Sequence, residues 1–242
     1  MELSKNHRID ELGNGYKIIQ DKTKFCFGTD AVILANFASL KNINKILDIG
    51  CGNGIIPILL CEKKETLQVT GLELQKESAL LAYENSKLNN LESRFKIIND
   101  DVLNIKTIFK GAKFDAVITN PPYVKLGGGI LNEADPLSIA RHEIKCTLED
   151  IIANSAYVLN HKGQFFMIHR ATRLSEIIFT LKKYNLEPKR IQFVHSIKPT
   201  FGEPTKKEDL INISEANMVL LEAVRGGNEF CKVLPPLILQ NT

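Results

Sequence analysis

Residues 47–57 read LDIGCGNGIIP, in which three alternate glycines, Gly50, Gly52 and Gly54, stand between an apolar run and a helical pattern. Glycine at this point lets the backbone turn tightly and lie against a ligand, because no Cβ stands in the way. We therefore predict a strand that ends in a ligand-binding turn and is followed by a helix.

The rest of the chain repeats this order of strand and helix. The expected strands read KILDIG (45–50), QVTGLEL (68–74), FKIIND (95–100), FDAVIT (114–119) and GQFFMIH (163–169). Helical spacing covers 54–64, 76–90, 147–160 and about 172–184. The alternation predicts an α/β fold, in which a mostly parallel sheet has helices on both faces. The last two expected strands, 190–197 and 216–224, have no long helix between them, so at least one should run antiparallel.

Length and composition are consistent with one domain. The 242 residues can form a single α/β unit, which we divide into an N-terminal segment (1–44) and a Rossmann-like core (45–242). No apolar run is long enough to span a bilayer, and the N-terminus does not read as a secretory signal. The five cysteines are unclustered, which argues against a disulfide framework or a metal site. We expect a cytoplasmic, metal-free monomer that does not associate with membranes.

Positive charge is concentrated in residues 161–207. This segment contains ten basic and three acidic residues, a local charge of +7, while the whole chain carries +3. Solvated helix faces would explain this pattern, but a surface that binds a polyanion such as RNA would explain it equally well.

Carboxylates follow the expected strands at positions suited to one cofactor. Glu73 ends the second strand about twenty residues after the glycines, which suits hydrogen bonds to both hydroxyls of a ribose. Asp48 would repel a pyrophosphate but suits an ammonium group. S-adenosylmethionine has both a ribose and an amino group and lacks phosphates, so we predict it as the cofactor. Asp101, or its neighbour Asp100, could accept a hydrogen bond from the adenine, although all these acids could instead cap helices.

Residues 118–124, ITNPPYV, follow the fourth strand, where the transferred methyl group would emerge. The lone pair of an exocyclic or amide nitrogen is delocalised, so an enzyme helps by accepting hydrogen bonds from both of its N–H groups. The Asn120 side-chain oxygen and the Pro121 carbonyl are suited to this, because the prolines fix the backbone. Tyr123 can stack on the planar target. We expect Asn120, Pro121 and Tyr123 to be catalytic, and Asn120 also to lie beside the cofactor.

The stretches DIGCGNG, GLEL, NDDV and ITNPPY, in this order, resemble class I S-adenosylmethionine-dependent methyltransferases that modify nitrogens. FGTDAVILA (27–35), ARHEIKCTLEDII (140–152) and MIHRATRL (167–174) narrow the resemblance to the bacterial tRNA1(Val) (adenine-37) N6-methyltransferase family. That family implies methylation of an adenine beside the anticodon of a valine tRNA.

The resemblance also implies a seven-stranded sheet with a reversed last strand. It implies that the segment from Phe27 to Asp30 folds over the methionine end of the cofactor, which makes Thr29 a candidate contact. An equally good interpretation of this segment is a hydrophobic staple with a helix cap at Thr29 or Asp30. Residues 141–143 (RHE) could bind phosphate or start a helix, and the loop at 198–216 is longer than the family pattern.

Four other functions remain open. A release-factor glutamine methyltransferase also uses NPPY, but it carries a helical domain before the glycine motif. A DNA adenine methyltransferase would need a large target-reading domain. A methyltransferase acting on a base amine of rRNA, and a non-catalytic cofactor sensor, are the others; the intact NPPY argues against the sensor.

Overall fold

The computed structural model describes residues 5–23, 28–111, 114–123, 146–197 and 213–239. The strands are β1 (His7–Gly13), β2 (Tyr16–Asp21), β3 (Lys45–Ile49), β4 (Gln68–Glu73), β5 (Phe95–Asn99), β6 (Phe114–Thr119), β7 (Leu159–Arg170), β8 (Leu186–Ser196), β9 (Met218–Arg225), β10 (Lys232–Val233) and β11 (Leu237–Leu239). The α-helices are α1 (Thr29–Phe37), α2 (Ile55–Lys63), α3 (Lys76–Leu88), α4 (Ile105–Ile108), α6 (Leu148–Val158) and α7 (Leu174–Lys183). Two 3₁₀ turns, η1 (Val102–Asn104) and η2 (Ala171–Arg173), complete the described elements.

The main sheet has the strand order β10-β8-β9-β7-β6-β3-β4-β5, with β11 also paired to β8. All its described pairings are parallel except those of β9, which runs antiparallel between β7 and β8. The predicted α/β class, the mostly parallel sheet and the reversed strand are therefore confirmed. The predicted number of seven strands is wrong, because β10 and β11 extend the sheet beyond β8 to nine strands.

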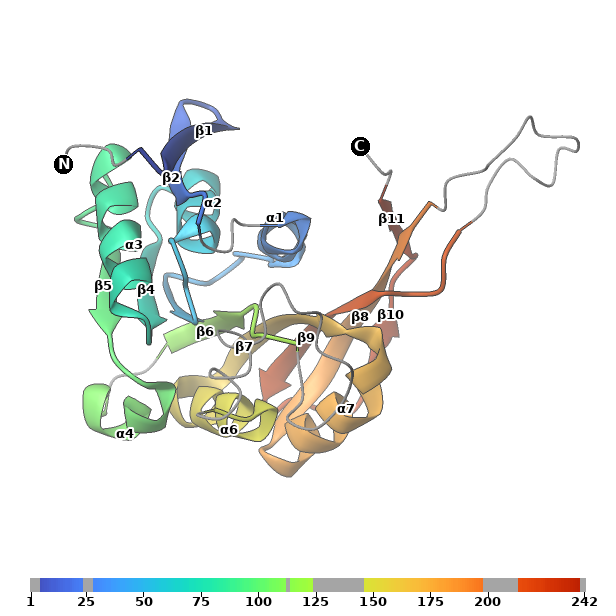
Figure 1. Ribbon diagram of the computed structural model, residues 1–242. Coiled ribbons are helices and arrows are strands. Elements are labelled where there is room, and N and C mark those ends of the chain that lie inside the picture. Colours follow the sequence, from blue (N-terminus) through green and yellow to red (C-terminus); the bar gives the residue numbers. More distant parts are fainter. Residues whose placement is uncertain (1–4, 24–27, 112–113, 124–145, 198–212, 240–242) are drawn as a thin grey trace, which may run out of the picture.

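Helices cover both faces of the sheet. Helices α1, α2 and α3 lie on one side and α4, α6 and α7 on the other (Figure 1). Each layer has its own hydrophobic core, one built around residues such as Ile46, Ile58 and Phe166 and the other around Leu47, Ile152 and Phe165. The adjacent pairs 46/47 and 165/166 divide between the two cores because successive side chains of a strand point to opposite faces.

The helix α6 begins as the sequence indicated. The Thr147 hydroxyl accepts a hydrogen bond from the Asp150 amide (3.1 Å), and the Asp150 carboxylate accepts one from the Thr147 amide (2.9 Å). This reciprocal pair is a capping box, which stabilises the first turn by satisfying two N–H groups that have no partner within the helix.

The N-terminal strands β1 and β2 form a separate antiparallel hairpin that packs on α3. Asn85 of α3 holds it, because its amide accepts from the Ile19 N–H (2.6 Å) and donates to the Ile19 carbonyl (3.0 Å). The same amide group donates to the carbonyl of Asn53, within the glycine-rich turn (2.9 Å). One buried side chain thus connects the hairpin to the loop that follows β3.

The C-terminal residues form the outer edge of the sheet beside β8. Two short strands lie there end to end, β10 opposite Arg190 and Ile191 and β11 opposite residues 194–196. Pro235 and Pro236 separate them, and the Pro235 carbonyl accepts a hydrogen bond from the Gln192 side chain (3.0 Å). No helix within the described residues is long and apolar enough to cross a membrane.

Candidate active site

The ends of the central parallel strands bring the predicted site residues to one edge of the sheet. Ile49, the last residue of β3, is paired with Leu72 of β4 on one side and with Thr119 of β6 on the other. The Thr119 hydroxyl also donates to the Ile49 carbonyl (2.9 Å), which fixes the tip of β6 against β3. Because these strands end in register, the glycine turn, Glu73 and Asn120 follow neighbouring positions along this carboxyl edge.

The glycine-rich turn has the backbone that its sequence requires. Three glycines of this turn have positive φ values, +75° at Gly50, +56° at Gly52 and +88° at Gly54. These values lie in the left-handed region of the backbone, which residues with a Cβ rarely adopt. The buried Glu73 carboxylate holds the turn, since one oxygen accepts from the Gly52 N–H (2.9 Å) and the other from the Gln75 N–H (2.8 Å). Glu73 is therefore fixed at the tip of β4, facing the turn.

Asp48 is a buried carboxylate without a local partner. Its side chain is fully buried in β3, and neither oxygen has a hydrogen-bond partner among the described residues. Burial raises the pKa of Asp48 well above its ordinary value of 3.8, and the nearby Glu73 carboxylate raises it further. A buried acid that lacks a donor is costly, so its presence next to the glycine turn indicates that a ligand supplies one.

The turn also leaves room for a ligand. A Cβ built on Gly50 or Gly52 meets no atom within 4 Å, whereas one on Gly54 would lie 2.8 Å from the Phe95 ring. The first two glycines therefore border open space and the third packs α2 against the core. Open space at the turn, the Glu73 carboxylate and the unpartnered Asp48 suit the ribose and amino group of S-adenosylmethionine, so the residues present fit the predicted cofactor.

Asp101 follows β5 at the same edge, but it has a structural contact. Its carboxylate accepts from the Leu103 N–H (2.9 Å) and caps the 3₁₀ turn η1. Asp100 likewise binds the Asp101 N–H and the Asn104 side chain. The capping interpretation of Asp101 is confirmed, and a contact between Asp101 and the cofactor adenine stays a prediction.

Asn120 and Tyr123 meet a third residue that the sequence did not link to them. The Tyr123 hydroxyl lies against the Asn120 side-chain oxygen and 3.0 Å from the carboxylate of Asp30 in α1. Pro121, between them, is buried. Burial raises the pKa of Tyr123, and the Asp30 carboxylate acts in the same direction, so the phenol keeps its proton.

The predicted helix cap at Thr29 or Asp30 is wrong. Gly28 is the N-cap of α1, and among the described residues no side-chain cap is found at its start. Asp30 instead faces Tyr123, which brings the first turn of α1, including the exposed Thr29, to the active-site edge. Phe27, which begins the implied lid segment, lies outside the described residues, as do residues 141–143.

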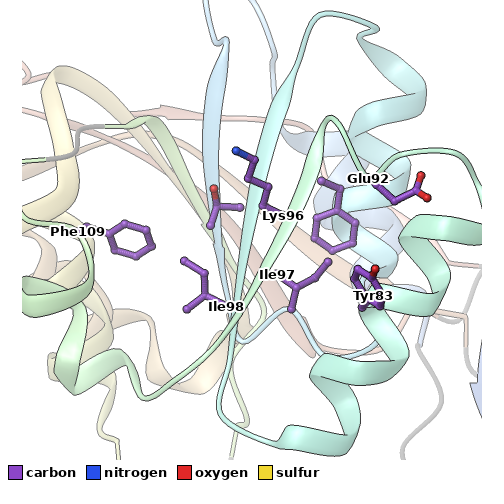
Figure 2. Close-up of a pocket in the computed structure, with 8 residues that line it drawn as sticks. Tyr83, Glu92, Lys96, Ile97, Ile98 and Phe109 are labelled. Carbon is purple, nitrogen blue, oxygen red and sulfur yellow. The ribbon is translucent and has the colours of Figure 1, made fainter.

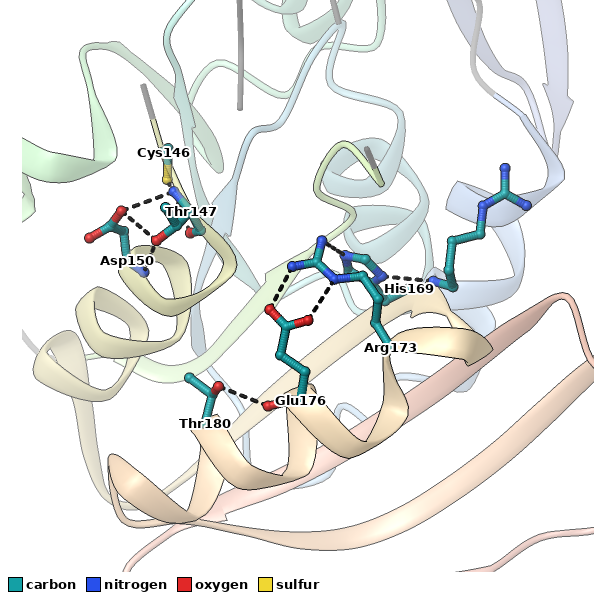
Figure 3. A network of polar contacts seen from close by, with 8 residues as sticks. Cys146, Thr147, Asp150, His169, Arg173, Glu176 and Thr180 are labelled. Atoms are coloured by element: carbon teal, nitrogen blue, oxygen red, sulfur yellow. Dashed lines mark hydrogen bonds and ion pairs between the residues drawn. The ribbon is translucent and has the colours of Figure 1, made fainter. Parts of the chain in front are cut away.

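The tip of β7 adds two residues that sequence analysis did not assign. The ring of His169 stands edge-on to Tyr123 with centroids 5.3 Å apart, and the Arg170 guanidinium lies 5.2 Å from the centre of the Tyr123 ring. Burial lowers the pKa of His169 to about 4, with Arg173 acting in the same direction, so this imidazole is neutral at physiological pH. Figure 3 shows His169 between the tip of the strand and the ion pair of Arg173 with Glu176.

The strand order alone would have predicted the position of His169 and Arg170. Because β7 is the parallel neighbour of β6, the residues His169 and Arg170 at its end had to lie beside Asn120.

The described basic residues of the segment 161–207 are spread along β7, α7 and β8. Lys162 lies near the start of β7 and Arg170 at its carboxyl end, whereas Arg190 is paired through Glu222 with Phe166, in the middle of β7. Four residues of β7 separate Phe166 from Arg170, roughly 13 Å at about 3.3 Å per residue. Arg190 is also paired with Glu222 and donates to the Phe37 carbonyl. Lys198, Lys206 and Lys207 lie outside the described residues, so a polyanion-binding surface in this segment stays a prediction.

A hollow of about 400 Å³ lies elsewhere, along β5 at the edge of the sheet. Figure 2 shows Tyr83, Lys96, Ile97 and Phe109 around it. Neither the glycine turn nor Asn120 lines it, so we do not assign the reaction to this hollow. Within the described residues there is no group of three or more His, Cys, Asp and Glu side chains that could hold a metal ion.

Solved structures with this fold are methyltransferases. A predicted O-methyltransferase from Agrobacterium tumefaciens superposes with a TM-score of 0.62 at 21% identity, over 86% of each chain. An S-adenosylmethionine-dependent O-methyltransferase from Thermotoga maritima gives 0.53 at 17% identity, over 86% of this chain and 68% of that one. At these identities the likeness concerns the fold alone.

Related sequences carry a more specific name. A protein of a Flavobacteriaceae bacterium, named tRNA1(Val) (adenine(37)-N6)-methyltransferase, is 26% identical over 73% of this chain and 79% of its own length. Proteins of the same name from Aliivibrio salmonicida and Porphyromonas gingivalis are 27% and 28% identical, over 75% and 70% of this chain and 72% and 68% of their own lengths. The model of the methyltransferase small domain matches residues 22–184, which is most of the chain. The chain therefore belongs to the methyltransferase small domain family.

Proposed function

We propose that this enzyme transfers a methyl group from S-adenosylmethionine to the exocyclic amine of adenine 37 in tRNA1(Val). One observation carries the proposal: Asn120 and Tyr123 lie at the tip of β6, on the edge of the sheet where the glycine turn and Glu73 would hold the cofactor. The names of the related proteins support the choice of substrate.

The residues divide into two groups by role. The backbone at Gly50 and Gly52 and the carboxylate of Glu73 would hold the nucleoside of the cofactor, while Asp48 would complement its amino group. Gly54 would complete the turn, and Asp101 and Thr29 would be further contacts of the cofactor. S-adenosylmethionine supplies an electrophilic methyl group on a sulfonium when bound.

The target amine would be held at the tip of β6. The Asn120 oxygen and the Pro121 carbonyl would accept hydrogen bonds from its two N–H groups, which localises the nitrogen lone pair. Tyr123 would stack on the adenine, and Arg170 would remain beside it to bind a phosphate of the same strand. Rigid placement of the acceptor atoms is the main contribution of these residues.

An adenine in an anticodon loop suits such a site, because an unpaired base costs less to turn out of its stack than a paired one. Residues 1–44 would then form the segment that faces the substrate, and residues 45–242 the core that binds the cofactor. We propose that the protein acts as a monomer in the cytoplasm, where the cysteines of the described residues stay as free thiols.

The test is nucleoside mass spectrometry of purified tRNA1(Val) from a deletion strain, complemented with the wild type or with Asn120→Ala. The expected result is loss of N6-methyladenosine at position 37, restored by the wild type and not by the variant. If that mark persisted and a methyl group were missing from rRNA or from a release-factor glutamine instead, the substrate would be reassigned to that molecule.

A further inference from the structure

The Tyr123 hydroxyl has one proton and two acceptors. It lies 3.0 Å from Asp30 Oδ2 and also in hydrogen-bond contact with Asn120 Oδ1. A phenol donates only one hydrogen bond, so it cannot satisfy both oxygens at once. A carboxylate is the stronger acceptor, because hydrogen bonds to ionised groups are roughly twice as strong as those between neutral groups.

The acceptor that the Tyr123 hydroxyl donates to decides which side of the Asn120 amide faces the substrate. When Tyr123 donates to Asn120 Oδ1, the oxygen that the chemistry needs is already occupied. When Tyr123 donates to Asp30, its oxygen becomes an acceptor, and Asn120 can turn its amide by half a turn to donate N–H to it. The Asn120 oxygen then points the other way and is free to accept a hydrogen bond from the target amine.

We propose that Asp30 is a positioning residue that acts through Tyr123 to orient the Asn120 amide for catalysis. The inference rests on the proposed function for its reaction, but the contacts that carry it are independent of the substrate. Asp30 is free for this task because it does not cap its own helix. The Tyr123 ring is held in place by His169 at its edge and Arg170 over its face, so its hydroxyl has little freedom to turn elsewhere.

This arrangement gives α1 a part in the reaction, although its residue Asp30 lies 93 residues before Tyr123 in the sequence. A contact between α1 and the tip of β6 can form only when the N-terminal part is folded against the sheet. The active orientation of Asn120 would therefore depend on the correct position of the segment before β3.

The test is a double-mutant cycle in kcat with tRNA and S-adenosylmethionine, using Asp30→Asn, Tyr123→Phe and the double variant. Asp30→Asn should lower kcat about 10- to 100-fold, by analogy with the outer groups that orient metal ligands, with KM for the cofactor unchanged. In the Tyr123→Phe background the same change should have no effect, because the connecting hydroxyl is absent. Glu77→Gln, which neutralises an exposed acid in the first turn of α3, is the control and should behave as wild type.

Three results would overturn the proposal: equal losses in both backgrounds, an effect confined to the KM of the cofactor, or the same loss in Glu77→Gln. A second measurement does not need turnover. In protein labelled with ¹³C at the tyrosine Cζ, the Tyr123 resonance (assigned with Tyr123→Phe) should move in Asp30→Asn and stay in Glu77→Gln. If the wild type methylated no tRNA but this resonance moved, the substrate would be wrong and the contact right; an unmoved resonance would refute the contact itself.

Discussion

Replacing Asp48 by asparagine should stabilise the protein in the absence of cofactor and weaken cofactor binding. The side chain is fully buried in β3, both oxygens lack partners among the described residues, and the Glu73 carboxylate is close enough to raise its pKa. Asparagine has nearly the same shape but carries no charge, so it removes the repulsion and most of the desolvation cost.

The magnitude follows from the charge alone, because asparagine stays a buried polar side chain without a partner; a pKa shift of one unit corresponds to about 1.4 kcal/mol. In a chain of this size 1 kcal/mol shifts Tm by about 2–4 °C, so each unit by which burial raises the pKa of Asp48 should appear as a rise in Tm of about 3–6 °C in Asp48→Asn. The gain depends on pH. Because the pKa of Asp48 is higher in the folded protein than the ordinary 3.8, the folded state binds more protons above pH 3.8 and loses stability as pH rises through the native pKa. The variant should therefore gain little at pH 4 and most at pH 8.

Differential scanning fluorimetry at pH 5 and pH 8, with and without S-adenosylmethionine, measures both effects. At the same excess concentration, cofactor should raise Tm more in the wild type than in the variant, because the free energy of stabilisation grows with the logarithm of the ratio of ligand concentration to Kd. Asp115→Asn is the matched control, because Asp115 accepts from the amides of Asn44 and Lys45 and should lose stability when neutralised. A lower Tm for Asp48→Asn at pH 8 without cofactor would refute the reasoning, since it would mean that the carboxylate has a partner.

Four further outcomes are expected. Asn120→Ala should lower kcat about 10²–10³-fold with cofactor affinity unchanged, by analogy with other preorganised hydrogen-bonding groups; calorimetry and single-turnover assays separate the two. Glu73→Ala should weaken S-adenosylmethionine binding by about 1.5–3 kcal/mol in calorimetry, the usual value for a hydrogen bond to a charged group. Arg170→Glu should raise KM for tRNA and reduce the slope of log KM against log salt by about one unit, whereas Lys45→Glu, a reversal at the opposite edge of the sheet, should leave both unchanged. Arg190→Glu should lower the free energy of unfolding by about 1.5–3 kcal/mol in urea titrations, because it breaks a half-buried ion pair.

The parts of the site that the sequence predicted are those that follow from a parallel sheet. Once β3, β4 and β6 were recognised as strands, their carboxyl ends had to meet at one edge, and the glycines, Glu73 and Asn120 had to meet with them. The Asp48 side chain could be placed there too, but its lack of a partner could not, because that depends on every side chain packed around it.

The contacts that the sequence did not predict join distant parts of the chain. Asp30 looked like a helix cap because it stands at the start of a helical pattern, and only the packing of α1 brings it to Tyr123. Similarly, β10 and β11 contain two and three residues, too few to show an alternation of polar and apolar side chains. Their pairing with β8 is set by the tertiary fold.

Pro235 and Pro236 affect how readily the protein aggregates at high concentration. The outer edge of a sheet offers unpaired N–H and C=O groups, to which another copy can add a strand and so begin to aggregate. Here the edge beyond β8 consists of two fragments of two and three residues, and the two prolines between them have no N–H to offer. A second chain therefore finds no continuous ladder to extend, and the tail of the protein keeps this side of the sheet from acting as a template for aggregation.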